Sequence, residues 1–422
     1  MSQVQQIQSK GIFHGLPVYP DSVTGLTAII TGANGISGHY MLRVLLQDPK
    51  RWNKIYCLSR RPPTIKGGLP DHVEHIPLDF LKDPKEIAST LKEKNVTADH
   101  VFFFSYLQPP PKPGQGLWSD ADEMVRVNTE LLNNFLGGLK QASITPKRFM
   151  LQTGAKYYGI HLGSTKLPQE ESDPRVELEP NFYYPQEDSL IQFCKETGCG
   201  WNGAMPGPIT GAVPDAAMNY AYPLAVYASV SKKLNQPLEF PGDIASWQMY
   251  QSMSYAMMNA YLEEWAVLSG PPNERYNAWD GAAFTWEGAW PKVASWYGLK
   301  SQGPTGDEKY NEVTTRFNPR GYGGKGVVRF KFSMAQWAKR DDVQKAWKEL
   351  SQEHGLSMPE EKELDRIFQF LDGSLCRPAA LIYSSDKLRK NGFHGYVDSS
   401  DALLETFHDL AKLKMVPPVP GK

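Results

Sequence analysis

The chain has 422 residues, enough for one large domain or two. Its 45 Lys and Arg residues balance 46 Asp and Glu residues, which excludes the basic field that nucleic-acid binding needs. Four cysteines without metal-ligand spacing predict neither a metal site nor a disulfide framework, and they favour a reducing, cytoplasmic compartment. The N-terminal residues MSQVQQIQSK lack the apolar core of a signal peptide, and no run of about 18 apolar residues predicts a membrane span.

A glycine turn between a strand and a helix is the first motif along the chain. Residues Leu26–Thr31 are an apolar, β-branched run typical of a buried strand, and Ile36–Gln47 has apolar residues near helical spacing. Gly32, Gly35 and Gly38 follow the strand in the spacing GxxGxxG. Glycine lets the backbone approach a pyrophosphate, and the helix N-terminus offers free N–H groups and the positive end of the helix dipole. This context predicts a dinucleotide site.

The next two strands bear on the choice of dinucleotide. The predicted strand Lys54–Leu58 is followed by Arg60 and Arg61, where NAD sites usually place an acidic residue. A guanidinium suits the 2′-phosphate of NADP, although two solvated loop charges would look the same. The third strand, Val73–Leu78, ends at Asp79. Its carboxylate can accept from an adenine amino group, or it can be an exposed charge at a strand end.

Strands and helices continue to alternate through the first half of the chain. The pattern predicts helices over Pro84–Glu93 and Ala121–Lys140 and strands over His100–Phe104 and Arg148–Gln152. This order is typical of an α/β Rossmann fold, a doubly wound parallel sheet. Ligands of such sheets bind beyond the carboxyl ends of the strands. The residues that lie at such ends are Ser105, Tyr106 and Thr153 to Lys156, together with the Gly32 turn.

The second half is rich in tryptophan and methionine and is predicted to be mainly helical. The predicted helices are Ala216–Lys233, Ile244–Leu268, Trp286–Trp296, Met334–Leu350, Pro359–Leu371 and Ser400–Leu413. These apolar side chains fit either an ordinary core or, taken together, a pocket for a hydrophobic substrate. The predicted division is an N-terminal extension over 1–24, a nucleotide domain over 25–205 and a substrate-binding part over 206–422. Short strands near 237–240 and 275–279 are expected to return to the sheet.

A lysine and a group of tyrosines supply the predicted chemistry. Lys156 follows a strand end, and Tyr183 lies at the start of the helical stretch Tyr184–Lys195. A phenol at a helix N-terminus can bind a carbonyl oxygen on which negative charge develops. A nearby ammonium is expected to lower the pKa of that phenol.

Other tyrosines compete for the same role. Tyr157, Tyr158 and Tyr184 are neighbouring phenols, and spacing alone does not choose among them. The Tyr-x-x-x-Lys spacing of most short-chain dehydrogenases occurs only at Tyr383–Lys387, far along the chain from the predicted site. We therefore do not assign that pair to the site.

Several segments resemble one known family. They are TGANGISG at 31–38, SRRP at 59–62, LD at 78–79, Asn128 in VNTELLNNFL, LQTGAKYYG at 151–159, NFYYPQED at 181–188, YNAWDGAAFTWEGAWPKVASWYG at 276–298 and NGFHGYVDSSDALLETF at 391–407. They are similar to motifs of the progesterone 5β-reductase/iridoid synthase-like proteins, which are atypical extended short-chain dehydrogenases. Several of these stretches are closer in sequence to the fungal members of the family than to the plant enzymes. The resemblance runs from about Leu26 to Pro417 and implies that Lys156 and Tyr183 are the catalytic pair.

The chain departs from the family pattern at three places. The family usually has Arg-Pro where this chain has Met205-Pro206, and Met205 cannot make an arginine's ionic contacts. Tyr157 replaces the histidine that commonly follows the catalytic lysine. The segment Gly159–Pro180 differs from the plant pattern, which leaves the substrate open.

These observations predict an NADPH-dependent reductase of the C=C bond of α,β-unsaturated carbonyl compounds. Its substrate is expected to be a small hydrophobic carbonyl compound, with no nucleic-acid or membrane partner and with a homodimer left open. The alternatives are 1,2-reduction of a carbonyl, an NADPH-dependent biosynthetic isomerase or cyclase, and a non-enzymatic NADP-responsive regulator. The predicted NADP(H)-binding residues are Gly32, Asn34, Gly35, Ile36, Gly38, Arg60, Arg61, Asp79, Phe80, Ser105, Tyr106, Thr153, Tyr183, Pro206 and Ile209.

Overall fold

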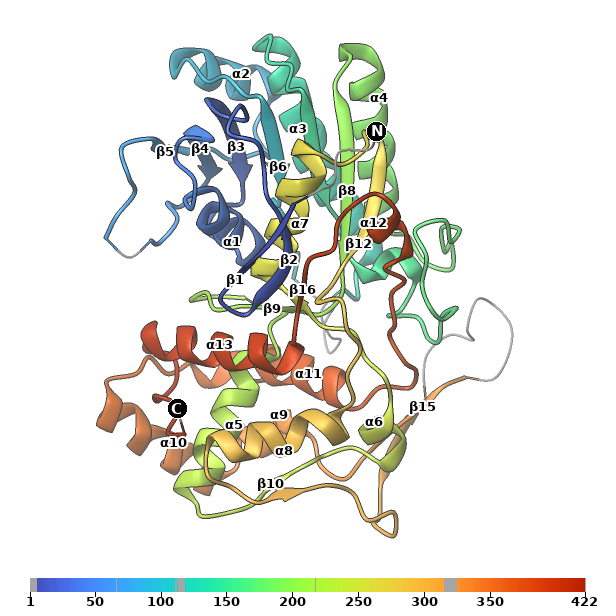
Figure 1. The fold of residues 1–422 in the computed structure, drawn as a ribbon. Coiled ribbons are helices and arrows are strands. Elements are labelled where there is room, and N and C mark those ends of the chain that lie inside the picture. The colour runs from blue at the N-terminus through green and yellow to red at the C-terminus, as the bar shows by residue number, and fades with distance from the viewer. Residues whose placement is uncertain are drawn as a thin grey trace.

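A seven-stranded, all-parallel sheet organises one lobe of the protein (Figure 1). The computed structural model describes residues 6–65, 67–110, 112, 118–216, 218–314 and 325–421. The strand order is β12-β8-β7-β6-β3-β4-β5. The strands are β3 (Leu26–Thr31), β4 (Trp52–Ser59), β5 (Val73–Pro77), β6 (His100–Phe103), β7 (Arg148–Gln152), β8 (Gly200–Pro206) and β12 (Glu274–Ala278). The predicted doubly wound sheet is confirmed.

Helices cover both faces of this sheet because successive strand residues point to opposite sides. Ile29 of β3 packs on the face covered by α2 (Pro84–Glu93), α3 (Ala121–Gln141) and α4 (Tyr183–Thr197). Ile30 packs on the other face, covered by α1 (Ile36–Leu45) and α7 (Ala256–Leu268). These helices cover the faces of the sheet but not the carboxyl ends of its strands, which lie on the side of the second lobe.

The second lobe is a helical assembly around an aromatic core (Figure 1). Its helices are α5 (Ala221–Lys233), α8 (Trp286–Trp296), α9 (Met334–Ala338), α10 (Asp341–His354), α11 (Leu364–Leu375) and α13 (Ser399–Lys412). Trp286, Trp290 and Trp347 are among the largest fully buried side chains. Individually, therefore, these tryptophans are core residues.

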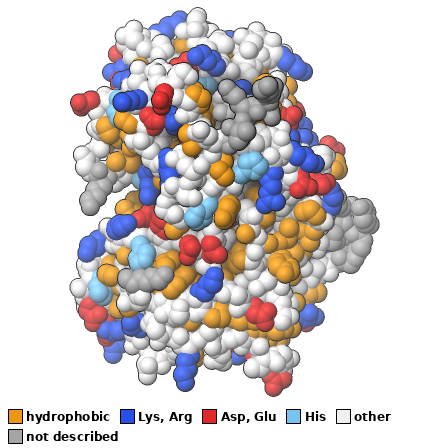
Figure 2. Space-filling view, viewed as in Figure 1, with side chains coloured by type: hydrophobic (Ala, Val, Ile, Leu, Met, Phe, Trp, Pro, Cys, Tyr) orange, Lys and Arg blue, Asp and Glu red, His pale blue; other side chains and the backbone are white. Residues whose placement is uncertain are grey.

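Short elements connect and flank the two lobes. They are η1 (Ala155–Tyr158), β9 (Ile209–Thr210), β10 (Leu238–Glu239), α6 (Ile244–Gln248), β11 (Ser254–Tyr255), β13 (Ser301–Gln302), β14 (Asn311–Thr314), β15 (Val327–Phe330), η3 (Glu361–Glu363) and α12 (Asp386–Lys390). Basic and acidic side chains are interspersed over the face drawn in Figure 2. None of the helices in the described part of the chain is both long and apolar enough to cross a membrane.

The two lobes exchange segments of the chain. Strand β12 and helix α7 lie beyond residue 205 in sequence but belong to the sheet lobe. The N-terminal strands β1 (Ile7–Lys10) and β2 (Phe13–Pro17) form a three-stranded sheet with β16 (Tyr396–Val397). The strand predicted near 275–279 thus returns to the main sheet. The one near 237–240 does not, because β10 pairs with β13 inside the helical lobe, where Trp290 Nε1 donates to the Leu238 carbonyl.

Two long predicted helices are interrupted. The stretch Ile244–Leu268 breaks after α6, where Gln251 exchanges backbone hydrogen bonds with Phe284 and β11 pairs with β9. The stretch Met334–Leu350 breaks at Arg340, whose backbone is extended and precedes a new helix beginning with two aspartates. Tertiary pairing in the first case, and a new helix start in the second, override the helical periodicity.

Candidate active site

The three glycines after β3 have different roles. Gly32 has a φ of +60°, a conformation that favours glycine. A Cβ atom added at Gly38 would lie 2.4 Å from the Gly32 carbonyl oxygen, so Gly38 is required by helix packing. A Cβ added at Gly35 would meet only that oxygen, at 3.4 Å, which is ordinary contact. Space therefore remains beside Gly35 at the N-terminus of α1, and a ligand can approach the backbone there.

Hydrogen bonds tie the neighbouring strand ends to this turn. The Thr31 hydroxyl oxygen accepts from the backbone N–H groups of Phe104 (3.0 Å) and Ser105 (3.2 Å). Gln152 Nε2 donates to the hydroxyl of Ser37, in the first turn of α1, over 2.8 Å. Sequence reasoning did not single out Thr31, Ser37 or Gln152. They place the ends of β3, β6 and β7 around one edge, where Asn34 and Ile36 are half-buried.

The two arginines after β4 are available to a ligand. Arg60 and Arg61 are exposed, and neither forms an ion pair with any residue in the described ranges. The Ser59 hydroxyl fixes the turn by donating to the Arg61 carbonyl over 2.7 Å. An unpaired pair of cations fits a phosphate group at this strand end.

The end of β5 differs from the expectation for side-chain contacts. Asp79 Oδ1 accepts from the Leu81 N–H over 3.0 Å, so this carboxylate caps the following turn. The Phe80 ring is buried against Phe135, with 4.9 Å between ring centroids, and its carbonyl accepts from Asn134. The Phe80 side chain is therefore a core group, and the predicted part of this residue in cofactor binding stays a prediction.

Asn181 joins the predicted catalytic lysine and tyrosine. Its Nδ2 donates to the Lys156 carbonyl over 2.9 Å, and its Oδ1 accepts from the Tyr183 N–H over 3.1 Å. Lys156 lies in the single turn η1 after β7, and Tyr183 is the first residue of α4. The asparagine belongs to the motif NFYYPQED, but only the structure reveals its bridging role.

The four competing phenols are distinguished by their hydrogen bonds. The Tyr157 hydroxyl donates to Glu187 (2.9 Å), and the Tyr158 hydroxyl donates to Asn277 (2.6 Å). The Tyr184 hydroxyl donates to the Tyr157 carbonyl over 2.8 Å. Within the described residues, the Tyr183 hydroxyl has no hydrogen-bond partner. The remaining free phenol is thus Tyr183, whose oxygen lies 2.9 Å from where a Cβ of residue 154 would be.

Burial dominates the electrostatics of this pair. It raises the pKa of the Tyr183 phenol and lowers the pKa of Lys156 well below its ordinary value, against the opposing charge of Glu179. The Lys156 ammonium lies over the Trp118 ring, 2.9 Å from its centroid. The expectation that this ammonium lowers the pKa of the phenol is therefore wrong for this structure, because the ammonium contacts an aromatic ring and burial governs the phenol.

An aromatic group lies beside Lys156 and Tyr183. Trp118 Nε1 donates to the Tyr106 hydroxyl over 2.7 Å. The Tyr106 ring lies 5.9 Å from Phe182, which lies 4.5 Å from the Tyr183 ring. Thr153 is half-buried, and its hydroxyl donates to the Ala204 carbonyl over 3.3 Å.

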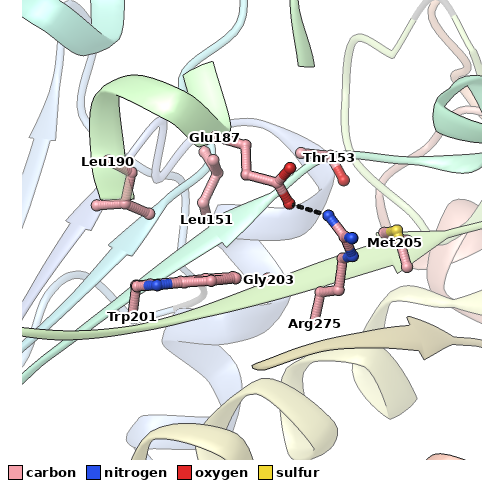
Figure 3. Close-up of a pocket in the computed structure, with 8 residues that line it drawn as sticks. All are labelled: Leu151, Thr153, Glu187, Leu190, Trp201, Gly203, Met205 and Arg275. Carbon is pink, nitrogen blue, oxygen red and sulfur yellow. Dashed lines mark hydrogen bonds and ion pairs between the residues drawn. The ribbon is translucent and has the colours of Figure 1, made fainter. Parts of the chain in front are cut away.

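A small pocket beneath α4 contains an ion pair, although Met205 in its lining cannot take part in one. Figure 3 shows Glu187 and Arg275 pointing toward one another across it, joined over 2.6 Å. Arg275 Nη1 also donates to the Tyr157 hydroxyl over 2.5 Å. Met205 lines the same pocket and is buried. A cation from the neighbouring strand β12 thus occupies the position next to Met205.

Tyr383 lies near the candidate site, although its distance along the sequence led us not to assign the Tyr383–Lys387 pair to it. Lys387 of the Tyr-x-x-x-Lys match pairs with Glu274, 2.5 Å away, and does not accompany the tyrosine. The Tyr383 hydroxyl is buried without a hydrogen-bond partner in the described structure and lies 3.5 Å from where a Cβ of Gly207 would be. Gly207 follows Pro206 at the end of β8, and Ile209 lies in β9 beyond it.

Comparison with known proteins identifies the family. The model of the PRISE-like Rossmann-fold domain matches residues 28–319. The chain belongs to this family. The family resemblance and the assignment to oxidoreductases of the short-chain dehydrogenase/reductase type are thereby confirmed.

Relatives match the PRISE-like chain over nearly its whole length. An uncharacterized protein of Schizosaccharomyces pombe is 31% identical over 414 residues, 93% of this chain and 98% of the relative. The short chain dehydrogenase gsfE of Penicillium aethiopicum is 30% identical over 400 residues, 93% of this chain and 99% of the relative. The (S)-8-oxocitronellyl enol synthase of Catharanthus roseus is 28% identical over 400 residues, 92% of each chain.

A solved structure shares the fold at low identity. The Bordetella bronchiseptica enzyme WbmG, solved in complex with NAD, aligns with a TM-score of 0.58 at 13% identity. The alignment covers 94% of this PRISE-like chain and 98% of that one. The Rossmann fold is thus confirmed, and the preference for NADP over NAD stays a prediction.

Proposed function

We propose that this protein catalyses the NADPH-dependent reduction of the C=C bond of α,β-unsaturated carbonyl compounds, with Tyr183 and Lys156 as the catalytic pair. The observation that carries the proposal is the Tyr183 hydroxyl, which has no hydrogen-bond partner among the described residues, beside three phenols that are already hydrogen-bonded. A phenol without a protein partner is available to donate to a substrate oxygen. Similarity to (S)-8-oxocitronellyl enol synthases also favours substrates with a conjugated carbonyl.

The residues around the β3–α1 turn fit NADP(H). The α1 N-terminus and the open Gly35 would hold the pyrophosphate, and Arg60 and Arg61 would hold the 2′-phosphate. Asp79, through its position at the end of β5, would bound the adenosine side. The chemistry that this cofactor supplies when bound is a hydride for the β-carbon of the substrate.

Tyr183 would act on the substrate oxygen. Because burial raises its pKa, the phenol stays protonated near neutral pH and can donate a hydrogen bond to the carbonyl. That bond strengthens as negative charge develops on the oxygen, which lowers the barrier. A proton from water or from a side chain then adds to the α-carbon and completes the saturated carbonyl product. Asn181 positions both members of the pair through the Lys156 carbonyl and the Tyr183 N–H.

The surroundings favour an apolar substrate body. Trp118, Tyr106 and Phe182 lie next to the pair and offer ring faces and edges to a hydrophobic molecule. The cytoplasmic location and a homodimer belong to this proposal as expectations from the sequence.

The proposal is tested by following NADPH oxidation with matched enals, enones and their saturated carbonyl analogues, with product analysis by mass spectrometry. We expect saturated carbonyl products from the conjugated compounds and no alcohol from the saturated ones. Alcohol products would indicate 1,2-reduction instead. NADPH binding without oxidation across the panel would favour a regulator or a non-redox enzyme.

A further inference from the structure

Arg377 is a half-buried cation that forms no ion pair within the described residues. It follows α11 directly after the C-cap residue Cys376, and its Nε is buried with no hydrogen-bond partner. None of the residues in the described ranges forms an ion pair with its guanidinium. The side chains outside those ranges include no Asp or Glu. A guanidinium that is partly withdrawn from water without a counter-charge favours an anionic ligand.

The electrostatic neighbours of Arg377 do not supply that partner. They are the phenols of Tyr383 and Tyr220, and burial raises the pKa of both, so they are neutral near pH 7. Burial lowers the pKa of Arg377, but a guanidinium keeps its proton in proteins. Among the described residues, the positive charge of Arg377 therefore has no counter-charge.

The surroundings of Arg377 lead to the proposed active site. The segment from Leu381 to Ser384 is held by backbone bonds to Gln169, and Tyr383 closes on the end of β8 at Gly207. The preceding residue, Pro206, has its carbonyl 3.4 Å from the same Cβ position at Gly154 that lies 2.9 Å from the Tyr183 hydroxyl. Tyr383 and Tyr183 therefore both lie near the end of β8.

The second neighbour of Arg377, Tyr220, belongs to the core of the helical lobe. It precedes α5 and follows Asn219, whose Nδ2 donates to the Gly211 carbonyl over 2.7 Å. A Cβ at Gly211 would lie 3.1 Å from Ile36 of the nucleotide turn. Arg377 therefore neighbours one tyrosine of the helical lobe, Tyr220, and one that packs with the Tyr183 cluster, Tyr383.

We propose that Arg377 binds a carboxylate of the substrate, so that the compound reduced is an unsaturated carbonyl with an apolar body and an anionic end. This inference rests on the proposed reduction and narrows its substrate class. The α1 N-terminus and the exposed arginines after β4 already provide for the phosphates of the cofactor. Arg377 instead shares Tyr383 with the Tyr183 side, and a guanidinium matches a carboxylate with two parallel hydrogen bonds.

The test compares 4-carboxycinnamaldehyde with its methyl ester, which has the same conjugated aldehyde and no charge. Binding of each to the NADP⁺-loaded protein is measured by calorimetry, a complex in which reduction cannot proceed. We expect the acid to bind about tenfold more tightly than the ester to the wild-type protein, as one charge-assisted contact gives. Arg377→Gln should abolish that difference, and Arg377→Lys should retain part of it.

Three results would overturn the inference. Equal binding of acid and ester to the wild-type protein is the first, and an acid preference unchanged in Arg377→Gln is the second. The third is a tenfold weaker NADP⁺ affinity in Arg377→Gln, which would assign the guanidinium to a cofactor phosphate. Melting curves control for folding, and Arg377→Lys keeps the charge if Arg377→Gln unfolds. Selective acid binding without turnover on NADPH would refute the reduction while leaving the carboxylate site intact.

Discussion

Two regions at the carboxyl edge of the sheet differ in how their polar groups are bonded. The nucleotide end is the region of the β3–α1 turn with Arg60 and Arg61, and the phenol end is the region of Lys156 and Tyr183. At the nucleotide end, Gly35 is uncrowded and Arg60 and Arg61 are exposed and unpaired within the described structure. At the phenol end, Tyr157, Tyr158 and Tyr184 are buried and hydrogen-bonded to protein groups. The first end offers several open groups. At the second end, Tyr183 is the one of the four neighbouring phenols whose hydroxyl has no hydrogen-bond partner among the described residues.

This difference indicates how each end achieves selectivity. Backbone N–H groups and exposed cations recognise charge wherever a phosphate fits, which tolerates variation in surrounding residues. Hydrogen bonds to protein groups occupy the hydroxyls of Tyr157, Tyr158 and Tyr184, so these phenols do not compete with Tyr183 for a substrate oxygen. Substitutions at the two ends should therefore fail in different ways.

Gly35→Val should have the largest effect and abolish NADPH binding. The side chain would occupy the space by which a pyrophosphate approaches the backbone, while the fold has room for a Cβ there. Calorimetric titration with a parallel melting curve measures both. Gly38→Val is the matched control and should lower the melting temperature, since its Cβ would meet the Gly32 carbonyl at 2.4 Å. Retained NADPH affinity in Gly35→Val would place the pyrophosphate elsewhere.

Tyr183→Phe should lower turnover roughly 10²–10³-fold, the usual cost of losing one oxyanion donor. NADPH affinity should hardly change, because the lost bond acts in the transition state. The defect should be larger for an enone than for a more reactive enal. Steady-state rates on one substrate of each kind provide the measurement, and an undiminished rate would remove Tyr183 from the mechanism.

Arg60→Ala combined with Arg61→Ala should weaken NADPH binding about 10- to 100-fold, as expected for charge-assisted hydrogen bonds of roughly 1.5–3 kcal/mol. NADH lacks the 2′-phosphate, so its dissociation constant should stay nearly the same. Titration of both cofactors against both proteins measures the difference. Equal dissociation constants for NADPH and NADH in the wild-type protein would contradict the proposed preference.

Tyr184→Phe should affect stability more than catalysis. Its hydroxyl accepts from the Val176 N–H over 2.8 Å and donates to the Tyr157 carbonyl, so its loss leaves buried groups unpaired. We expect the free energy of unfolding to fall by about 1–3 kcal/mol while turnover stays within a few-fold of wild type. Denaturant unfolding and kinetics on the same preparation test this. Crippled turnover with normal stability would exchange the roles of the two tyrosines.

The nucleotide end could be predicted from sequence far better than the phenol end. The strand Leu26–Thr31 and the helix Pro84–Glu93 have the predicted bounds, because local apolar patterns specify them. The hydrogen-bond state of a phenol depends on residues distant in sequence, such as Asn277 for Tyr158. Tyr383 packs beside Tyr158 through a loop contact that no periodicity encodes. The same dependence on distant pairing broke the predicted helix Ile244–Leu268.

The exchange of segments between lobes has a consequence for synthesis on the ribosome. Strands β3 to β8 emerge in one continuous run, yet α7, which covers one apolar face beside α1, follows some 50 residues later. Until α7 has been synthesised, the nascent sheet exposes that apolar face. Strand β2 can pair with β16 only near the end of translation. Nascent chains with exposed apolar surface are prone to aggregate and engage chaperones. A chain released after β8 should therefore be insoluble rather than a smaller nucleotide-binding protein.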